Sequence, residues 1–137
     1  MSKKGVLQCA ALPFRVVDGE PQVLLITTKR THRWIIPKGW PEPDRPIHEQ
    51  AAAEAWEEAG VRGDVSAHSV GAFGYDKVRK NGKVRPLYVR VFPLAVTEVA
   101  NDWPEADLRE RRWFATAEAA EAVQEPELKS LLAAFQP

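Results

Sequence analysis

Three glutamates stand close together in one stretch, residues 39–61, which reads GWPEPDRPIHEQAAAEAWEEAGV. On a helix of about 3.6 residues per turn, Glu54, Glu57 and Glu58 share one face, with neighbouring Cβ atoms about 5–6 Å apart. Like charges at that spacing repel one another and destabilise a plain surface helix. A hard divalent cation would remove that cost, because Mg²⁺ and Mn²⁺ take oxygen ligands. The spacing therefore favours a metal site over the alternative, a solvated acidic face.

The helix that carries these glutamates has a small apolar side. That side is formed by Ala51, Ala52, Ala55 and Ala59. It predicts a helix that lies close against a sheet and so has a fixed direction. Pro46 suits the first helical position, which makes Arg45 the N-cap, and Gly60 is the expected stop because glycine readily adopts positive φ.

The stretch resembles the signature of the Nudix hydrolases, G-x5-E-x7-R-E-U-x-E-E-x-G-U, in which U is an aliphatic residue. The residues at matching positions are Gly39, Glu54, Ala55, Glu57, Glu58, Gly60 and Val61. Two positions depart from the pattern: Arg45 replaces the first glutamate and Ala53 replaces the arginine. Residues 34–40 and 111–114 further resemble one branch, the diphosphoinositol-polyphosphate and diadenosine-polyphosphate hydrolases and their bacterial relatives.

This resemblance implies an α/β (α+β) fold, a Nudix-like α/β/α sandwich with a mixed central sheet, in one domain spanning residues 1–137. It implies Mg²⁺ or Mn²⁺ as cofactor, held by Glu54, Glu57, Glu58 and the Gly39 carbonyl. The same three glutamates are the expected catalytic residues, with Glu54 orienting or deprotonating the attacking water. The implied reaction is hydrolysis of a phosphoanhydride bond in a nucleoside- or inositol-linked polyphosphate.

The two departures support a second hypothesis, a catalytically weakened or inactive ligand-binding module on the same fold. In the family pattern the arginine holds acidic members of the site in place, and Ala53 cannot do this. Such supporting contacts commonly change metal affinity or activity by about 10–100-fold. Glu49 or Glu42 is a candidate for a displaced carboxylate that makes up for Arg45, and Glu98 or Glu105 for an extra acid from a late loop.

Basic residues surround the signature in the sequence. Arg33 and Lys38 precede it closely and are expected to contact substrate phosphate. A second cluster, Lys77, Arg79, Lys80, Lys83 and Arg85, surrounds the expected Asn81-Gly82 hairpin turn. From this cluster Arg79 and Arg85 are candidate substrate ligands, although lysines and arginines there are equally consistent with protection of an edge strand.

The composition bounds the function further. A chain of 137 residues with a formal net charge of +0 has no bulk field that attracts nucleic acid or membrane, so a small phosphorylated substrate is the expected partner. Cys9 is alone, which excludes an internal disulfide and fits a reducing cytoplasm; its neighbours suggest a small buried side chain. No segment is long and apolar enough to span a membrane. Homodimers are common among the proteins resembled.

Hydrophobic patterns place the remaining elements. The expected strands are 6–17, 22–28, 34–36, 65–75, 84–96 and 111–114, and the expected helices are 46–59, 116–123 and one that begins at Pro126. Pro13 predicts a bulge or an edge position in the first strand. Asn81-Gly82 predicts a two-residue hairpin turn. Leu128, Leu131, Leu132 and Phe135 predict the buried side of the last helix.

Overall fold

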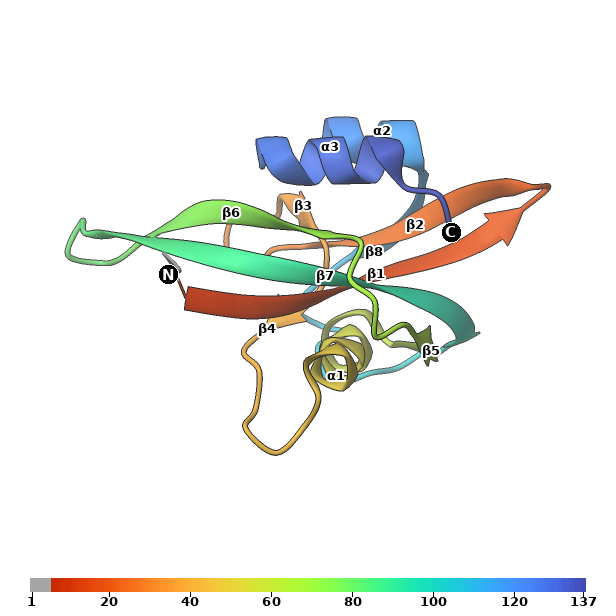
Figure 1. The fold of residues 1–137 in the computed structure, drawn as a ribbon, viewed down its shortest axis with the longest axis horizontal. Helices are drawn as coiled ribbons and strands as arrows, with labels where there is room; N and C mark the ends of the chain where they lie inside the picture. Colours follow the sequence, from red (N-terminus) through yellow and green to blue (C-terminus); the bar gives the residue numbers. More distant parts are fainter. Residues whose placement is uncertain (1–5) are drawn as a thin grey trace.

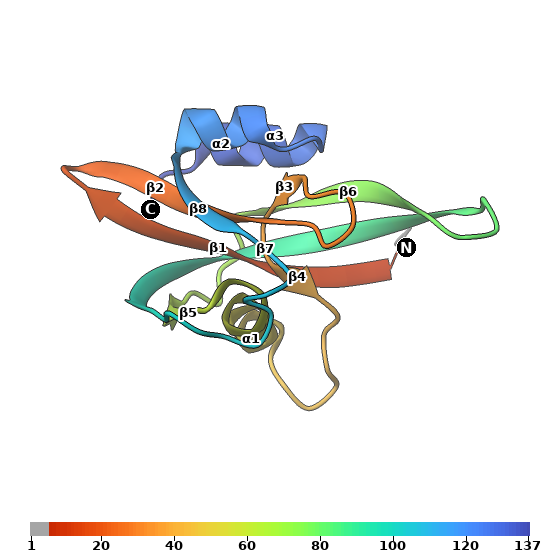
Figure 2. The ribbon, with the colours of Figure 1, turned by 180° about the vertical axis from the view of Figure 1, so that it is seen from behind.

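The structure, a computed structural model, describes residues 6–137. The elements are β1 (Val6–Val17), β2 (Glu20–Thr27), β3 (Trp34–Ile35), β4 (Lys38–Gly39), α1 (Ile47–Ala59), β5 (Val61–Val65), β6 (Gly71–Val78), β7 (Val84–Val99), β8 (Arg111–Ala115), α2 (Thr116–Ala122) and α3 (Pro126–Ala134). Helix α1 covers one face of the sheet, and α2 and α3 lie side by side on the other face (Figures 1 and 2). The expected α/β/α sandwich is therefore confirmed.

The sheet is mixed, as expected. Its central pair, β1 and β7, runs parallel from Val6↔Leu87 to Phe14↔Ala95, whereas β2, β3, β4, β5, β6 and β8 all pair antiparallel. Strand β2 is covered on both faces, and its run from Val23 to Ile26 is almost completely buried. Such continuous apolar runs are typical of strands that are buried on both sides.

Pro13 is not at an edge, so that alternative of the sequence prediction, which named a bulge or an edge position, is wrong. It lies opposite Leu94 in the parallel pairing of β1 with β7. On the other side of β1, the printed pairing with β4 covers Cys9 and Ala10, and the pairing with β2 begins at Phe14. Pro13 thus falls between two antiparallel partners, where the missing N–H interrupts no antiparallel ladder.

The two hairpin turns, at Asp18-Gly19 and at Asn81-Gly82, differ in length and in backbone conformation. Asp18 and Gly19 both have positive φ, 53° and 80°, and join β1 to β2 as a two-residue turn. The Asn81-Gly82 turn is longer than the predicted two residues. Arg79 N donates to Lys83 O, and Gly82 N donates to Arg79 O. Within this turn only Gly82 has positive φ, and Asn81 Oδ1 accepts a hydrogen bond from Lys83 N.

The expected strand 65–75 is wrong, because the structure divides it into β5 and β6. Both strands pair with β7 along the same edge, and β7 is long enough to hold both. Between them Ser69 Oγ accepts a hydrogen bond from Gly71 N and donates one to Gly71 O, and Gly71 has a φ of 146°. This local turn interrupts the ladder and redirects the chain.

Helix α1 begins one residue later than expected, with Pro46 rather than Arg45 as N-cap. Gly60 ends it in the left-handed conformation (φ 70°), as predicted. Ala51, Ala55 and Ala59 are fully buried against the sheet. In the last helix, Leu128, Leu132 and Phe135 are buried and Leu131 is partly buried, which confirms the predicted apolar side.

Among residues 6–137, no helix has both the length and the hydropathy needed to cross a membrane. Cys9 is fully buried in the core, as predicted. Its Sγ lies 3.7 Å from Gly39 O, to which the thiol donates. Burial and the nearby Glu54 charge raise the pKa of Cys9 to about 12.

Candidate active site

The glutamate face of α1 points toward β4. Glu54 and Glu58 are partly buried, whereas Glu57 is exposed. The carboxyl group of Glu54 lies so close to the backbone of Gly39 that a Cβ added at Gly39 would overlap it. Gly39 does not have positive φ, so glycine at this position of the signature leaves room for the Glu54 carboxyl rather than for an unusual backbone conformation. The structure brings Gly39, Glu54 and Glu58 together.

Glu58 is held from two directions. Its Oε1 accepts a hydrogen bond of 3.1 Å from Lys38 N, and its Oε2 lies 3.6 Å from Arg109 Nη2. Burial raises the pKa of Glu58 from 4.5 to about 7, and the Glu54 and Glu105 charges add to this effect. Arg109 and the Lys38 amide act in the opposite direction. Burial is the largest contribution because the side chain is only 12% exposed.

Glu54 is supported by a residue that the sequence did not identify. Gln50, which is buried, donates from Nε2 to Glu54 Oε2 at 2.8 Å, and its Oε1 accepts from Arg45 Nη1 at 3.1 Å. Burial raises the pKa of Glu54, the Gln50 hydrogen bond lowers it, and the Glu57 charge raises it further. Arg45 therefore reaches the site through Gln50. Glu42 and Glu49, the expected replacements, are exposed side chains.

The segment between β7 and β8 packs over the C-terminal end of α1. Glu105 N donates to Glu57 O, and Trp103 Nε1 donates to Glu58 O at 3.1 Å. The side chain of Glu105 accepts a 2.7 Å hydrogen bond from Arg109 Nε, and Arg109 in turn donates to Thr27 O. This segment thus adds one acid and one arginine to the glutamate cluster. Glu98, the other candidate, pairs with Arg62 on an exposed part of β5 and β7.

The donor chemistry of the site fits a divalent cation that is shared with a substrate. Among residues 6–137, no group of three or more His, Cys, Asp or Glu side chains is arranged to hold a metal ion by itself. Mg²⁺, however, is commonly bound by one or two carboxylates together with substrate phosphate, rather than by a cage of protein ligands. Glu54 and Glu58 supply two such carboxylates, buried enough for a cation to relieve their repulsion.

The expected phosphate ligands line two neighbouring basic cavities of about 380 Å³ each. Arg33 and Lys38 line the first, and Arg79 and Arg85 line the second together with the exposed Trp40. Both cavities include Arg30 and Lys77. We call these two cavities the basic groove. Its link to the glutamates is Lys38, whose backbone amide binds Glu58.

Two of the expected ligands already have protein partners. Lys38 Nζ donates to the Tyr75 hydroxyl at 2.9 Å, and that hydroxyl donates to the buried Gln8 at 2.9 Å. Arg33 Nη1 forms a 2.9 Å ion pair with Glu125 Oε2. These partners fix the two cations in place before any substrate binds.

Partly buried carboxylates on α1, linked through Lys38 to a basic groove, are groups that a pyrophosphohydrolase needs. The family model described as "NUDIX domain" matches residues 8–135, so the chain belongs to the Nudix hydrolase family.

Relatives of known name agree with this assignment. The chain is 33% identical over 137 residues to Nudix hydrolase 17, mitochondrial, of Arabidopsis thaliana, covering 95% of this chain and 72% of the relative. It is 35% identical over 120 residues to diphosphoinositol polyphosphate phosphohydrolase 3-alpha of Mus musculus, covering 85% and 68%. Its fold resembles the C. elegans Ap4A hydrolase with a TM-score of 0.64, 21% identity and 95% coverage of both chains.

Proposed function

We propose that this protein hydrolyses a phosphoanhydride bond in a nucleoside- or inositol-linked polyphosphate, with Mg²⁺ or Mn²⁺ as cofactor. The observation that carries the proposal is the position of Lys38. Its backbone amide holds Glu58 of the carboxylate cluster, and its ammonium group lines the basic groove. A polyphosphate bound in the groove would therefore share Lys38 with the carboxylate cluster.

We assign phosphate binding and cation binding to two different groups of residues. Arg33, Lys38, Arg79 and Arg85 bind the phosphate chain and neutralise part of its charge. Glu54, Glu57, Glu58 and the Gly39 carbonyl would hold the divalent cation, which supplies charge neutralisation at the phosphate oxygens and lowers the pKa of bound water.

Glu54 is the proposed group that orients or deprotonates the attacking water. Its carboxyl is fixed by Gln50 and lies against Gly39, so it has a defined direction. Burial raises the pKa of Glu54 in the metal-free protein. Glu57 is exposed at the edge of the cluster and would complete it by turning its side chain toward a bound cation.

The test is cleavage of a panel of nucleoside polyphosphates, dinucleoside polyphosphates, nucleotide sugars and diphosphoinositol phosphates, with the products separated by chromatography, because dinucleoside polyphosphates and nucleotide sugars are split into two phosphorylated products without orthophosphate. Each compound is assayed with Mg²⁺, with Mn²⁺ and with a chelator. We expect turnover of one class that requires metal and is lost in Glu54→Gln and in Glu57→Gln. Glu49→Gln, an exposed glutamate on the same helix, is the matched control and should retain full activity.

Turnover that is unchanged in Glu54→Gln and Glu57→Gln would refute the site assignment. Binding of a polyphosphate without turnover under any metal condition would instead support the second hypothesis, a ligand-binding module that lacks catalysis. Its basis is the replacement of two signature residues by Arg45 and Ala53.

A further inference from the structure

Lys38 is held at both ends. Its backbone amide donates to Glu58 Oε1 at 3.1 Å, and its ammonium Nζ donates to the Tyr75 hydroxyl at 2.9 Å. The same Nζ lies 4.8 Å from the centre of the Tyr75 ring, which is a cation–π distance. A free lysine side chain samples many rotamers, and these contacts with one aromatic residue restrict them. The link between the glutamates and the basic groove is therefore a fixed one.

The Tyr75 hydroxyl carries one proton, and its two partners determine the direction of that proton. An ammonium group can only donate, so the hydroxyl accepts from Lys38. Its own proton then points to Gln8 Oε1, which lies 2.9 Å away on β1. Gln8 is buried, with only 5% of its surface exposed. These three residues form a directed chain of hydrogen bonds from the interior of the sheet to the groove.

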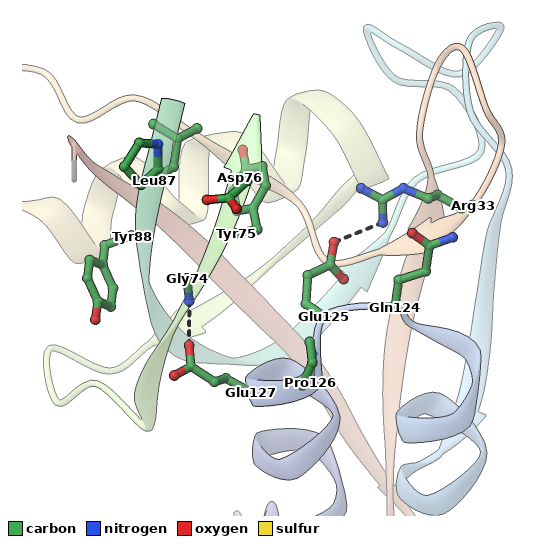
Figure 3. A pocket seen from close by; sticks show the side chains of 11 residues that line it. Arg33, Gly74, Tyr75, Asp76, Leu87, Tyr88, Gln124, Glu125, Pro126 and Glu127 are labelled. Carbon is green, nitrogen blue, oxygen red and sulfur yellow. Dashed lines mark hydrogen bonds and ion pairs between the residues drawn. The ribbon is translucent and has the colours of Figure 1, made fainter. Parts of the chain in front are cut away.

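Tyr75 also lies between the basic groove and a third cavity, of about 610 Å³, because it lines both spaces (Figure 3). This third cavity has an acidic lining, formed by the side chains of Asp76, Glu125 and Glu127. An ammonium group released by Tyr75 would be attracted toward these carboxylates and away from the groove. The hydroxyl contact therefore keeps the charge of Lys38 on the side of the groove.

We propose that Tyr75 is a positioning residue that decides which phosphoanhydride bond is cleaved. The proposal rests on the proposed function. Lys38 binds one phosphate of the chain, and its backbone contact with Glu58 ties that phosphate to the carboxylate cluster. The ammonium held by Tyr75 therefore sets the register of the chain, since a chain shifted by one phosphate presents a different anhydride bond to the carboxylates. The hold also strengthens binding, because the lysine side chain has already lost its freedom.

The experiment uses two substrates that each contain two different anhydride bonds, ATP and diadenosine tetraphosphate. The first gives either ADP and orthophosphate or AMP and pyrophosphate, and the second gives either two molecules of ADP or AMP and ATP. Each cleavage consumes one water, whose oxygen bonds to the attacked phosphorus while the bridging oxygen leaves with the other product and the released proton goes to solvent. Separation of the products by chromatography identifies the bond that breaks.

Wild type should give one product pair from each substrate that it cleaves. In Tyr75→Phe, which keeps the ring and removes the hydroxyl, we expect KM to rise about 2–10-fold and a second product pair to form roughly a tenth or more of the total. Gln8→Met removes the acceptor that directs the hydroxyl and should change the products in the same direction. Tyr75→Phe should have no further effect in Lys38→Met, because the hydroxyl acts through that ammonium.

Tyr88→Phe is the matched control. Tyr88 is the other tyrosine of the chain, and it lines the third cavity but neither part of the basic groove. This variant should keep the KM and the products of wild type. Melting curves of all variants report whether the fold is retained, and a new product pair is a result that lost stability would not produce.

The outcomes separate this proposal from the proposed function. A single product pair in Tyr75→Phe, or a mixture already in wild type, would overturn the role of Tyr75 and leave the hydrolase intact. If neither compound is cleaved, calorimetric binding of inorganic tripolyphosphate in the presence of a chelator decides. Weaker binding by Tyr75→Phe than by Tyr88→Phe supports the hold of Tyr75 on Lys38, and equal or absent binding overturns it.

Discussion

Glu58 gives the sharpest prediction for the metal-free protein. Four charged or polar groups surround its carboxyl: Arg109 and the Lys38 amide favour the ionised form, and Glu54 and Glu105 disfavour it. Burial outweighs all of them and raises the pKa of Glu58 from 4.5 to about 7. The perturbation is Glu58→Gln, which keeps the shape of the side chain and removes its titration.

The direction of the pH effect follows from proton linkage. Between the unfolded pKa of 4.5 and the folded pKa of about 7, the folded protein holds a proton on Glu58 that the unfolded chain has released. The free energy of unfolding therefore decreases as pH rises through this window. At 1.36 kcal/mol for each pKa unit, the contribution of this residue amounts to roughly 3 kcal/mol over the whole window.

The assay is urea denaturation in the presence of a chelator, at pH 5.0 and pH 7.5, of wild type, Glu58→Gln and the exposed control Glu49→Gln. The loss of stability between the two pH values should be roughly 2–3 kcal/mol larger in wild type and in Glu49→Gln than in Glu58→Gln. Added Mg²⁺ should stabilise wild type more at pH 7.5, because a cation binds the deprotonated carboxylates. The same pH dependence in wild type and Glu58→Gln would refute the reasoning.

Three further predictions concern the packing around the site. Gly39→Ala should lower kcat by about tenfold or more with little change in Tm, because its Cβ displaces the flexible carboxyl of Glu54. Enzyme assays and melting curves check this, and an unchanged kcat would contradict it. Gly63→Ala should lower the urea midpoint, corresponding to a loss of roughly 1–3 kcal/mol, because its Cβ would overlap the Ala95 backbone where the register between β5 and β7 shifts, between Arg62 and Gly63. A midpoint equal to that of wild type would be inconsistent with this packing. The Cys9 thiol, buried and with its pKa raised to about 12, should react with a thiol reagent only after unfolding, measured with and without urea. Rapid labelling of the native protein would contradict the burial of the Cys9 thiol.

Local patterns were sufficient to predict most of the fold. The buried run of β2, the alanine side of α1 and the leucine side of α3 each follow from hydrophobic periodicity within one element. The predictions of strand bounds and of the position of Pro13 were wrong where they depend on which strands pair with each other. The strand expected at 65–75 became two because β7 pairs with both pieces, and Pro13 is tolerated inside β1 because two partners meet there.

In the candidate site, too, the residues defined by local spacing could be predicted, and those defined by distant contacts could not. Glu54 and Glu58 could be predicted because their spacing on one helix is a local property. Glu125 and Arg109 could not, since their partners are far away in the chain: Arg33 lies 92 residues from Glu125, and Thr27 lies 82 residues from Arg109. No spacing rule within a segment predicts contacts that depend on how α3 and the β7–β8 segment fold back onto the sheet.

The two departures from the family signature form one connected arrangement. Where the pattern has an arginine that supports the glutamates, Ala53 offers no polar group, and Gln50 on the preceding turn of α1 donates to Glu54 instead. An amide could face either way, but the guanidinium of Arg45 donates to its oxygen and so directs the amide N–H toward Glu54. A cation at position 45 thus suits a glutamine at position 50 better than the acid of the pattern would. The support that Ala53 cannot give comes from these two residues, which favours an active hydrolase over a domain that has lost its chemistry.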